Sequence, residues 1–531
     1  MKRMSRSLFV MAALYGLLFV IGDLYLARQA APVWVAVMLP IVIIGLKYLL
    51  APVFIRWVLP IEWDDNKTLI PARNHEFLSE LCQRQGLPLP RIGIIRSSLP
   101  NAFTFGRVPS DASIVLTSGL LDGLELEEVN AVIAHEAGHI KHWDFLVMSV
   151  AALVPMMLYQ LYAFTRRVKD DHWIAYAAYA AYWVSEWILL SLSRVREYDA
   201  DNFAATSTNA PQALSSALVK IGYGMVKLEA DQVYSMKHGD DAEKKRARQQ
   251  MGVAGAIGVL GISSAAGNGA FALTGMEGDD AAAVMKWDIV NPWARVYEMR
   301  STHPITAFRI KALSQLATSL GQPPQFKFDF NQKIEWQLFP LELALWVVPW
   351  IFGVAFVVTR SLGHRVALFG LADWISAACA IAMGSAWCAR IAYKYYGEFE
   401  PAKIKDLLEA TEISDMRPRA VWLEGKVIGR GGEDAFWIPD MVLKQESNIM
   451  FLQYPGWIPF ARLAFGASTI KQYLGESVVV EGWYRRSGRP YVEIRSISVE
   501  GGKSHRPWVI FGEYLMALVT TAVFLWLAIP R

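Results

Sequence analysis

Cysteine and charge are both scarce in this 531-residue chain, and each scarcity excludes a class of protein. Cys82, Cys379 and Cys388 are the only cysteines, too few for a disulfide framework and not spaced as a thiolate metal site. Any metal ligands must therefore be histidines and carboxylates. Charged residues make up 19% of the chain and hydrophobic residues 54%, which excludes a soluble multidomain protein and predicts a membrane protein. The net charge of +3 is too small to indicate nucleic-acid binding.

Long hydrophobic runs are abundant. Seven apolar segments are long enough to span a bilayer, at about residues 8–27, 32–55, 143–164, 173–193, 341–359, 366–389 and 507–529. The first follows a basic leader and resembles a signal peptide, but a second apolar segment follows at once and favours a retained hairpin. The absence of an internal repeat and of paired broken helices argues against a transporter.

The polar segments between these spans predict the domain organisation. We expect membrane hairpins at 1–55, 143–193 and 341–389, catalytic parts at 56–142 and 194–340, a polar module at 390–506 and a final membrane helix at 507–531. An even number of spans separates the polar parts, so all three should lie on one side with the N-terminus. The basic leader at residues 1–7 favours the cytoplasmic side, although basic residues at 166–169 and 360–365 would then lie on the far side.

One motif in the first catalytic part indicates metal chemistry. His135, Glu136 and His139 form an HExxH sequence, on a segment whose carboxylate-rich start and apolar spacing predict a helix. Residues four apart share a helix face, so both imidazoles can bind one metal ion while Glu136 reaches a water on it. This arrangement is typical of a zinc hydrolase. The metzincin pattern requires a third histidine at position 145, which is Phe145, so the third ligand must come from elsewhere.

Two carboxylates directly after the fourth apolar segment are candidates for that ligand. Glu197 and Asp201 are four residues apart and share a helix face, so one can bind the metal while the other supports a ligand by a hydrogen bond. The spacing leaves open which carboxylate binds. A solvated acidic face paired with Arg194 and Arg196 is the alternative interpretation.

Four separated motifs together resemble those of the HtpX-like membrane zinc metallopeptidases, the gluzincin group that also includes the type I CAAX prenyl endopeptidases. The motifs begin at Pro100 (PNAFTFG), His135 (HEAGH), Arg194 (RVREYDAD) and Ser301 (STHPITAFR). The resemblance covers residues 1 to about 320. It implies a gluzincin-type peptidase domain with one zinc ion per chain.

The resemblance also implies roles for individual residues. Glu197 would be the third zinc ligand beside His135 and His139, and Glu136 would be the catalytic base. Asp201 would be a carboxylate partner of the metal site, and Arg309 would support the acidic cluster. His303 would stabilise the oxyanion. Asn101 and Ala102 would lie on an edge strand that binds the substrate backbone by β-augmentation.

Two regions depart from the HtpX pattern. Residues 224–300 contain a charged stretch and the Gly/Ala-rich run 251–276, which we interpret as a partly ordered insertion, although a membrane segment or a plug over the site is the alternative. Residues 418–500 read as β-rich and predict a five-stranded barrel of the OB type. This module has no dense basic and aromatic face for nucleic acid, so substrate docking or packing is expected.

We therefore expect a mainly α-helical, multi-pass membrane protein with about seven transmembrane helices, a zinc endopeptidase domain and an OB-like module. The expected location is a bacterial-type inner membrane, with the catalytic domain facing the cytoplasm. The expected partners are protein or peptide substrates and the lipid bilayer, without nucleic acid; the sequence indicates no oligomeric state. The leading function is cleavage of membrane or misfolded proteins. The alternatives are a protease specific for a prenyl-protein-like tail, and a catalytically weak zinc-bound scaffold that recruits partners through the β module.

Overall fold

The computed structural model describes residues 33–166, 172–222 and 279–328, and most of residues 334–529. The predicted span at 8–27 and the Gly/Ala-rich run at 251–276 lie outside the described residues. The chain divides into two compact units. The first unit holds the described residues up to 222 and residues 296–328, and the second holds residues 279–295 and the described chain after residue 329.

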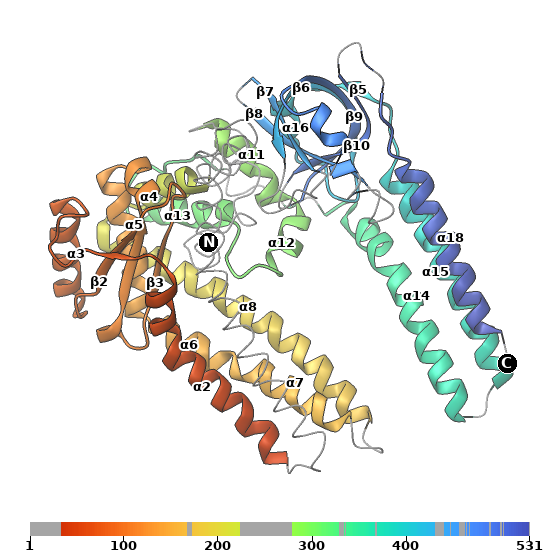
Figure 1. Cartoon of the computed structure of the whole chain (residues 1–531), viewed down its shortest axis with the longest axis horizontal. Helices are drawn as coiled ribbons and strands as arrows, with labels where there is room; N and C mark the ends of the chain where they lie inside the picture. Colours follow the sequence, from red (N-terminus) through yellow and green to blue (C-terminus); the bar gives the residue numbers. More distant parts are fainter. Residues whose placement is uncertain are drawn as a thin grey trace. The chain divides into compact units, whose positions relative to one another are not determined.

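A small mixed sheet lies toward one end of the first unit (Figure 1). Its strands are β1 (Glu62–Trp63), β2 (Arg91–Ile95), β4 (Ser113–Thr117) and β3 (Ala102–Phe105), in the order β1-β2-β4-β3. β2 and β4 are parallel, whereas β3 pairs antiparallel with β4 alone. The residues of β4 are all buried, as expected of a central strand. β3 is therefore an edge strand, which leaves one side of its backbone unpaired within the sheet.

Short helices of the first unit lie beside this sheet, and long apolar helices extend away from it (Figure 1). They are α2 (Val33–Val58), α3 (Ala72–Gln85), α4 (Ser118–Gly123), α5 (Leu126–Lys141), α6 (Asp144–Ala151), α7 (Leu153–Thr165), α8 (His172–Thr208) and α13 (Thr306–Ser319), with a 3-10 turn η1 at Pro109–Asp111. α5 packs against β3 and β4. A capping box between Glu125 and Glu128 starts α5, and both side chains satisfy backbone N–H groups at the helix N-terminus.

The second unit is built on a closed five-stranded barrel. Its strands are β6 (Arg419–Arg430), β7 (Met441–Gln445), β8 (Asn448–Gln453), β9 (Ser477–Arg485) and β10 (Tyr491–Val499). They are ordered β6-β7-β8-β10-β9, and pairing between β6 and β9 closes the barrel. The short β5 (Glu400–Pro401) pairs in parallel with β6. The predicted five-stranded barrel is therefore confirmed. The other elements of this unit are α11 (Asp279–Val290), the start of α12 (Pro292–Glu298), α14 (Phe339–Val366), α15 (Phe369–Lys394), α16 (Ile404–Glu409), a 3-10 turn η3 (Thr469–Gln472) and α18 (Val509–Ala528).

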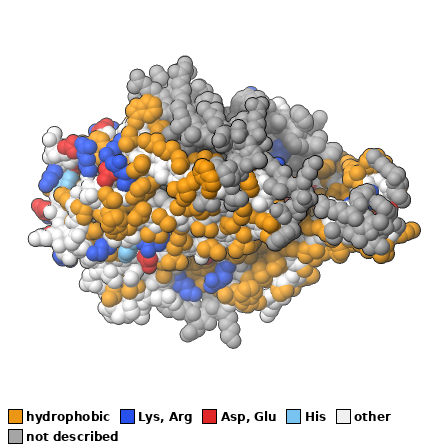
Figure 2. Space-filling view, turned by 90° about the horizontal axis from the view of Figure 1, so that it is seen from below, with side chains coloured by type: hydrophobic (Ala, Val, Ile, Leu, Met, Phe, Trp, Pro, Cys, Tyr) orange, Lys and Arg blue, Asp and Glu red, His pale blue; other side chains and the backbone are white. Residues whose placement is uncertain are grey.

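Five helices in the described part of the chain are long and apolar enough to cross a membrane. They cover Met38–Val58, Asp144–Thr165, Phe339–Ser361, Leu371–Lys394 and Val509–Ala528. Large apolar side chains such as Trp350, Trp374 and Leu518 are exposed on them, and hydrophobic side chains cover much of the face seen in Figure 2. Such surface suits contact with lipid. The expected number of seven spans is not confirmed, because the segment at 173–193 forms the first half of α8 but is not among these five helices.

Candidate metal centre

The HExxH motif lies in the C-terminal half of α5, the helix that the sequence predicts for it. His135 is completely buried, whereas His139 keeps part of its surface accessible. Gly138, between the two histidines, faces α8, and a Cβ atom added there would lie 3.1 Å from Ala200 Cα. The glycine therefore allows α8 to pack closely against α5, which brings Glu197 to the histidines.

Three side chains converge where a metal ion would bind. The Nε2 atoms of His135 and His139 are 3.2 Å apart, and they lie 3.6 and 3.9 Å from the two carboxylate oxygens of Glu197. One ligand atom from each residue can be chosen so that all lie within 4.8 Å of one another. Glu197 Oε2 is buried, and its distances of 3.6 Å to His135 and 3.7 Å to Arg309 are too long for hydrogen bonds. An unsatisfied buried carboxylate oxygen facing two imidazoles fits a metal ligand.

The outward-facing nitrogens of both histidines meet carboxylates. His135 Nδ1 lies 3.0 Å from Asp201 Oδ1, and His139 Nδ1 lies 2.6 Å from Asp144 Oδ2. Carboxylates in this position fix the ring orientation, so that Nε2 points at the metal. Arg309 supports the first pair by donating two hydrogen bonds to Asp201, of 2.8 and 2.6 Å. Glu197 and Asp201 therefore occupy different positions at the site, a distinction that their spacing left open.

Asp144 was not among the residues singled out from the sequence. It follows His139 by five residues, beyond one helical turn, and reaches the histidine because Trp143 adopts a left-handed conformation (φ 58°) between α5 and α6. Arg196, which the sequence suggested as a partner for a solvated acidic face, forms an ion pair with Asp144 as well as with Asp199 on its own helix. The signal available in the sequence for this contact was Asp144 itself, a carboxylate shortly after the HExxH helix.

The electrostatics of the cluster keep its carboxylates charged. Burial alone would raise the pKa of Glu197, but the neighbouring imidazoles of His135 and His303 hold it well below its usual value. Burial likewise opposes the ionised form of Asp201, yet the Arg309 charge lowers its pKa. Burial would lower the pKa of His135, but Asp201 and Glu197 together raise it to about 9. Without a metal ion, the cluster therefore holds a proton that a cation would displace.

Glu136 points to the other side of the motif, toward the edge strand. Its side chain is almost fully buried, and Thr104 Oγ1 on β3 donates a hydrogen bond of 2.6 Å to its Oε2. The second carboxylate oxygen of Glu136 is not used by this bond. The sequence did not single out Thr104, although it belongs to the strand motif that begins at Pro100.

His303 also lies at the cluster. Its Nδ1 is 3.1 Å from Glu197 Oε1, and the loop that carries it is held to α8 by Arg194, which donates hydrogen bonds to the carbonyl oxygens of Glu298 (3.0 Å) and Ser301 (2.9 Å). The structure thus brings together residues from α5, α8 and the loop before α13.

The proposed substrate-binding residues Asn101 and Ala102 lie at the start of β3, and both are fully buried. The Asn101 side chain accepts a hydrogen bond from the Ala102 N–H (2.9 Å), which helps to fix the strand. Thr104 and Phe105, further along β3, and Gly106 directly after the strand line the cavity instead.

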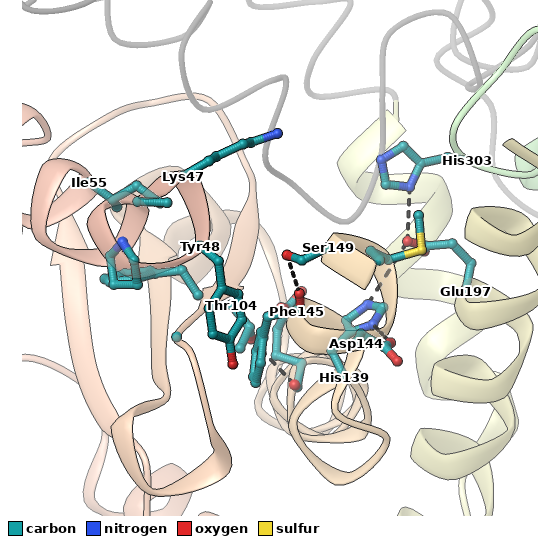
Figure 3. Close-up of a pocket in the computed structure, with 16 residues that line it drawn as sticks. Lys47, Tyr48, Ile55, Thr104, His139, Asp144, Phe145, Ser149, Glu197 and His303 are labelled. Atoms are coloured by element: carbon teal, nitrogen blue, oxygen red, sulfur yellow. Dashed lines mark hydrogen bonds and ion pairs between the residues drawn. The ribbon is translucent and has the colours of Figure 1, made fainter. Parts of the chain in front are cut away.

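A cavity of about 350 Å³ opens beside the cluster (Figure 3). The lining residues come from α2, β3, α5, α6, α8 and the His303 loop: Lys47, Tyr48, Ala51, Pro52, Ile55, Thr104, Phe105, Gly106, Glu136, His139, Asp144, Phe145, Met148, Ser149, Glu197 and His303. One wall is mainly apolar and the opposite wall holds the candidate metal ligands. A peptide segment could lie between the two walls.

Comparison with known proteins agrees with this geometry. The model of Peptidase family M48 matches residues 71–317. A protein named Protease HtpX homolog from Methanothermobacter thermautotrophicus is 35% identical over 210 residues, which are 39% of this chain and 80% of that protein. A second from Moorella thermoacetica is 32% identical over 245 residues, covering 43% and 78% respectively. The crystal structure of S. mikatae Ste24p is more distant, with 18% identity, a TM-score of 0.37 and coverage of 59% of this chain and 65% of that chain.

The family model and the two HtpX homologues agree with the resemblance that the four motifs indicate. The M48 match contains the HExxH helix, the Glu197 segment of α8 and the His303 loop. Members of this family are metalloproteases, and the apolar helices make this chain a membrane protein. The chain therefore belongs to peptidase family M48, as a membrane metallopeptidase related to the HtpX proteases.

Proposed function

We propose that the protein is a zinc-dependent endopeptidase that cleaves membrane or misfolded proteins at the cytoplasmic face of the membrane. The observation that carries the proposal is the convergence of His135, His139 and Glu197 beside the buried carboxylate of Glu136 and an open cavity. Two imidazoles and one carboxylate are a ligand set typical of catalytic zinc, which keeps a further position for water.

Each side chain has a task in the proposed hydrolysis. A bound zinc ion would lower the pKa of the attacking water towards about 7. Glu136 accepts a proton as water attacks the scissile carbonyl, and passes it to the departing amine. Thr104 holds one oxygen of Glu136, so that the other is free for this exchange. His303 donates a hydrogen bond to the carbonyl oxygen as negative charge develops there.

The edge strand β3 supports a binding mode for the substrate backbone. An extended peptide can pair with the unpaired side of an edge strand, which holds the backbone without specifying every side chain. The part of β3 that lines the cavity is Thr104 and Phe105, so we propose that the peptide pairs there. Asn101 and Ala102 would then shape the strand from its buried start.

A tail-specific protease is the alternative within the same chemistry. That interpretation depends on seven spans that enclose a chamber, and the described residues contain five candidate spans. A catalytically weak scaffold is less well supported, because the candidate ligands and the base occur together. We therefore propose a general endopeptidase.

Cleavage of casein by the purified full chain in detergent tests this function. We expect proteolysis that a chelator abolishes and zinc restores. Glu136→Gln should lose about 100-fold or more in rate while keeping about one zinc ion per chain, because Glu136 moves protons and does not bind the metal. Near-normal cleavage by Glu136→Gln would refute the mechanism, and undiminished cleavage after complete zinc removal would refute the metal dependence.

A further inference from the structure

The cavity wall opposite the metal cluster carries an unexplained positive charge. Five residues of α2 line the cavity, namely Lys47, Tyr48, Ala51, Pro52 and Ile55. Their spacing of one, four, five and eight residues from Lys47 places them on one helix face. This face of an apolar helix therefore borders the catalytic cavity.

Contacts on the same helix hold this face in place. The Tyr48 hydroxyl donates a hydrogen bond to the carbonyl oxygen of Arg107, just beyond β3. Just over two helical turns further on, Arg56 forms an ion pair with Asp111 at 3.3 Å. These contacts hold α2 against the segment that follows the edge strand. They therefore also fix the position of the backbone that carries Lys47.

Lys47 differs from Arg56 because it has no ion pair with any described residue. Its side chain is exposed and extends from α2 toward the side of the cavity on which His303 and Glu197 lie (Figure 3). Among the described residues that line the cavity, no other is a lysine or arginine. An ionisable side chain in an apolar, potentially membrane-spanning helix is costly unless it meets water or an opposite charge.

The carboxylates of the cavity do not account for this charge. Asp144 is already paired with Arg196 and His139, and Glu197 faces the two histidines of the cluster. Glu136 accepts a hydrogen bond from the Thr104 hydroxyl. Because no described carboxylate of the cavity pairs with Lys47, its ammonium group can bind a group that enters the cavity from outside.

We propose that Lys47 binds a carboxylate side chain, Asp or Glu, of the peptide substrate, and so creates a preference for one acidic residue near the scissile bond. This inference rests on the proposed function. A peptide is favoured over an anionic lipid because the same cavity contains Glu136, His139 and Glu197, the groups proposed to cleave or hold a peptide. The apolar side chains Ile55, Phe145 and Met148 on the surrounding walls suit uncharged residues beside the acidic one.

The first experiment is a peptide scan with the full-length, zinc-loaded protein in nanodiscs of uncharged lipid. In a set of otherwise identical apolar peptides, one glutamate moves stepwise along the sequence, and each peptide has a glutamine twin. We expect one position at which glutamate lowers KM by roughly 10-fold relative to glutamine, with little change in kcat. Equal KM values for every pair would overturn the proposal.

Three variants test whether Lys47 is the cause. Lys47→Met keeps the length of the side chain and should abolish the glutamate preference, whereas Lys47→Arg should retain it. Lys47→Glu should reverse it, so that a lysine peptide binds better than its glutamine twin at the same position. Zinc content and elution volume equal to wild type show that each variant is folded. A preference that survives in folded Lys47→Met or Lys47→Glu would contradict the assignment.

Binding without turnover separates this inference from the proposed function. The fluorescence anisotropy of labelled glutamate and glutamine peptides is measured with Glu136→Gln protein and with Glu136→Gln, Lys47→Met protein. The expected loss of discrimination in the second protein supports the Lys47 site even if the wild type cleaves none of the peptides. An effect of Lys47 that follows the anionic lipid content of the nanodisc, and not the peptide charge, would assign the lysine to lipid and overturn the proposal.

Discussion

At the scale of single residues, the hydroxyl of Thr104 determines how Glu136 is held. Thr104→Val removes the donor of the 2.6 Å bond while nearly keeping the shape of the side chain. A hydrogen bond to a charged group contributes about 1.5–3 kcal/mol, so we expect kcat to fall roughly 10 to 100-fold with KM little changed. Steady-state kinetics measure both parameters. Thr104→Ser, which keeps the hydroxyl, should stay near wild type; an equal loss in both variants would indicate that only packing matters.

The pKa of His135 predicts how zinc affinity depends on pH. Its folded pKa of about 9 lies above the usual 6.5, so metal-free protein carries a proton on this imidazole at neutral pH. The stability contributed by that charge is fully present below about pH 6.5 and is lost as pH rises through 9. Zinc requires the neutral ring, so its apparent affinity should rise about tenfold per pH unit between pH 7 and 9. Competition with a chromophoric chelator measures this slope, and a flat profile would contradict the charged His135.

The sequence predicted part of this site. The four-residue spacing in HExxH was enough to place His135, Glu136 and His139 on one helix face. Glu197 and Asp201 could not be distinguished by spacing alone, because their difference arises from how α8 packs against Gly138. Asp144 could not be assigned, because its position depends on the left-handed turn at Trp143.

At the scale of elements, α11 joins the barrel although it belongs to the region interpreted as an insertion. The indole of Trp287 donates a hydrogen bond of 2.6 Å to the carbonyl oxygen of Ile413. Arg486, directly after β9 of the barrel, donates a hydrogen bond of 3.0 Å to the carbonyl oxygen of Val284. Composition suggested a partly ordered region, and the buried tryptophan was the overlooked signal. The barrel strands were predictable, because their runs of β-branched and aromatic residues between turns have a local signature.

Asp288 of α11 makes the second unit sensitive to pH. It is 1% exposed, its Oδ2 lies 4.0 Å from Arg486, and burial raises its pKa to about 6 from an ordinary 3.8. The folded state therefore binds the Asp288 proton more tightly than the unfolded state does. The resulting contribution to the free energy of unfolding is fully present below pH 3.8 and is lost as pH rises through 6.

Asp288→Asn should remove this pH dependence. The shift corresponds to at most about 3 kcal/mol, so the thermal midpoint of the wild type should fall between pH 5 and pH 8 more than that of Asp288→Asn. Thermal unfolding in detergent, followed by tryptophan fluorescence, measures the difference. Parallel pH profiles of the two proteins would show that Asp288 does not titrate in this range.

At the scale of the whole molecule, the metal cluster restricts the membrane topology. His135 precedes the candidate span at Asp144–Thr165, and Glu197 follows it, yet their side chains meet. The chain must therefore leave and return to the same side, and the first half of α8 is the segment that can bring it back. The positions of His135 and Glu197 therefore support a crossing at 173–193, although this segment is not among the five candidate spans.

Labelling of single cysteines tests this topology. In a chain whose native cysteines are replaced, cysteines at the exposed positions Lys67, Thr206 and Lys403 should all react with a membrane-impermeant maleimide from one face, which we expect to be cytoplasmic. Thr206 labelled from the opposite face to Lys67 would contradict the return through α8. Lys403 labelled alone from the other face would indicate an additional crossing between the two units.

The zinc content of two variants tests the central claim most directly, namely that His135, His139 and Glu197 hold the metal. Elemental analysis of purified full-length protein should find about one zinc ion per chain in the wild type. Glu197→Ala should bind none, whereas Asp201→Ala should retain zinc with affinity weakened by about 10 to 100-fold, because Asp201 acts through His135. Full zinc in Glu197→Ala together with loss in Asp201→Ala would contradict the account.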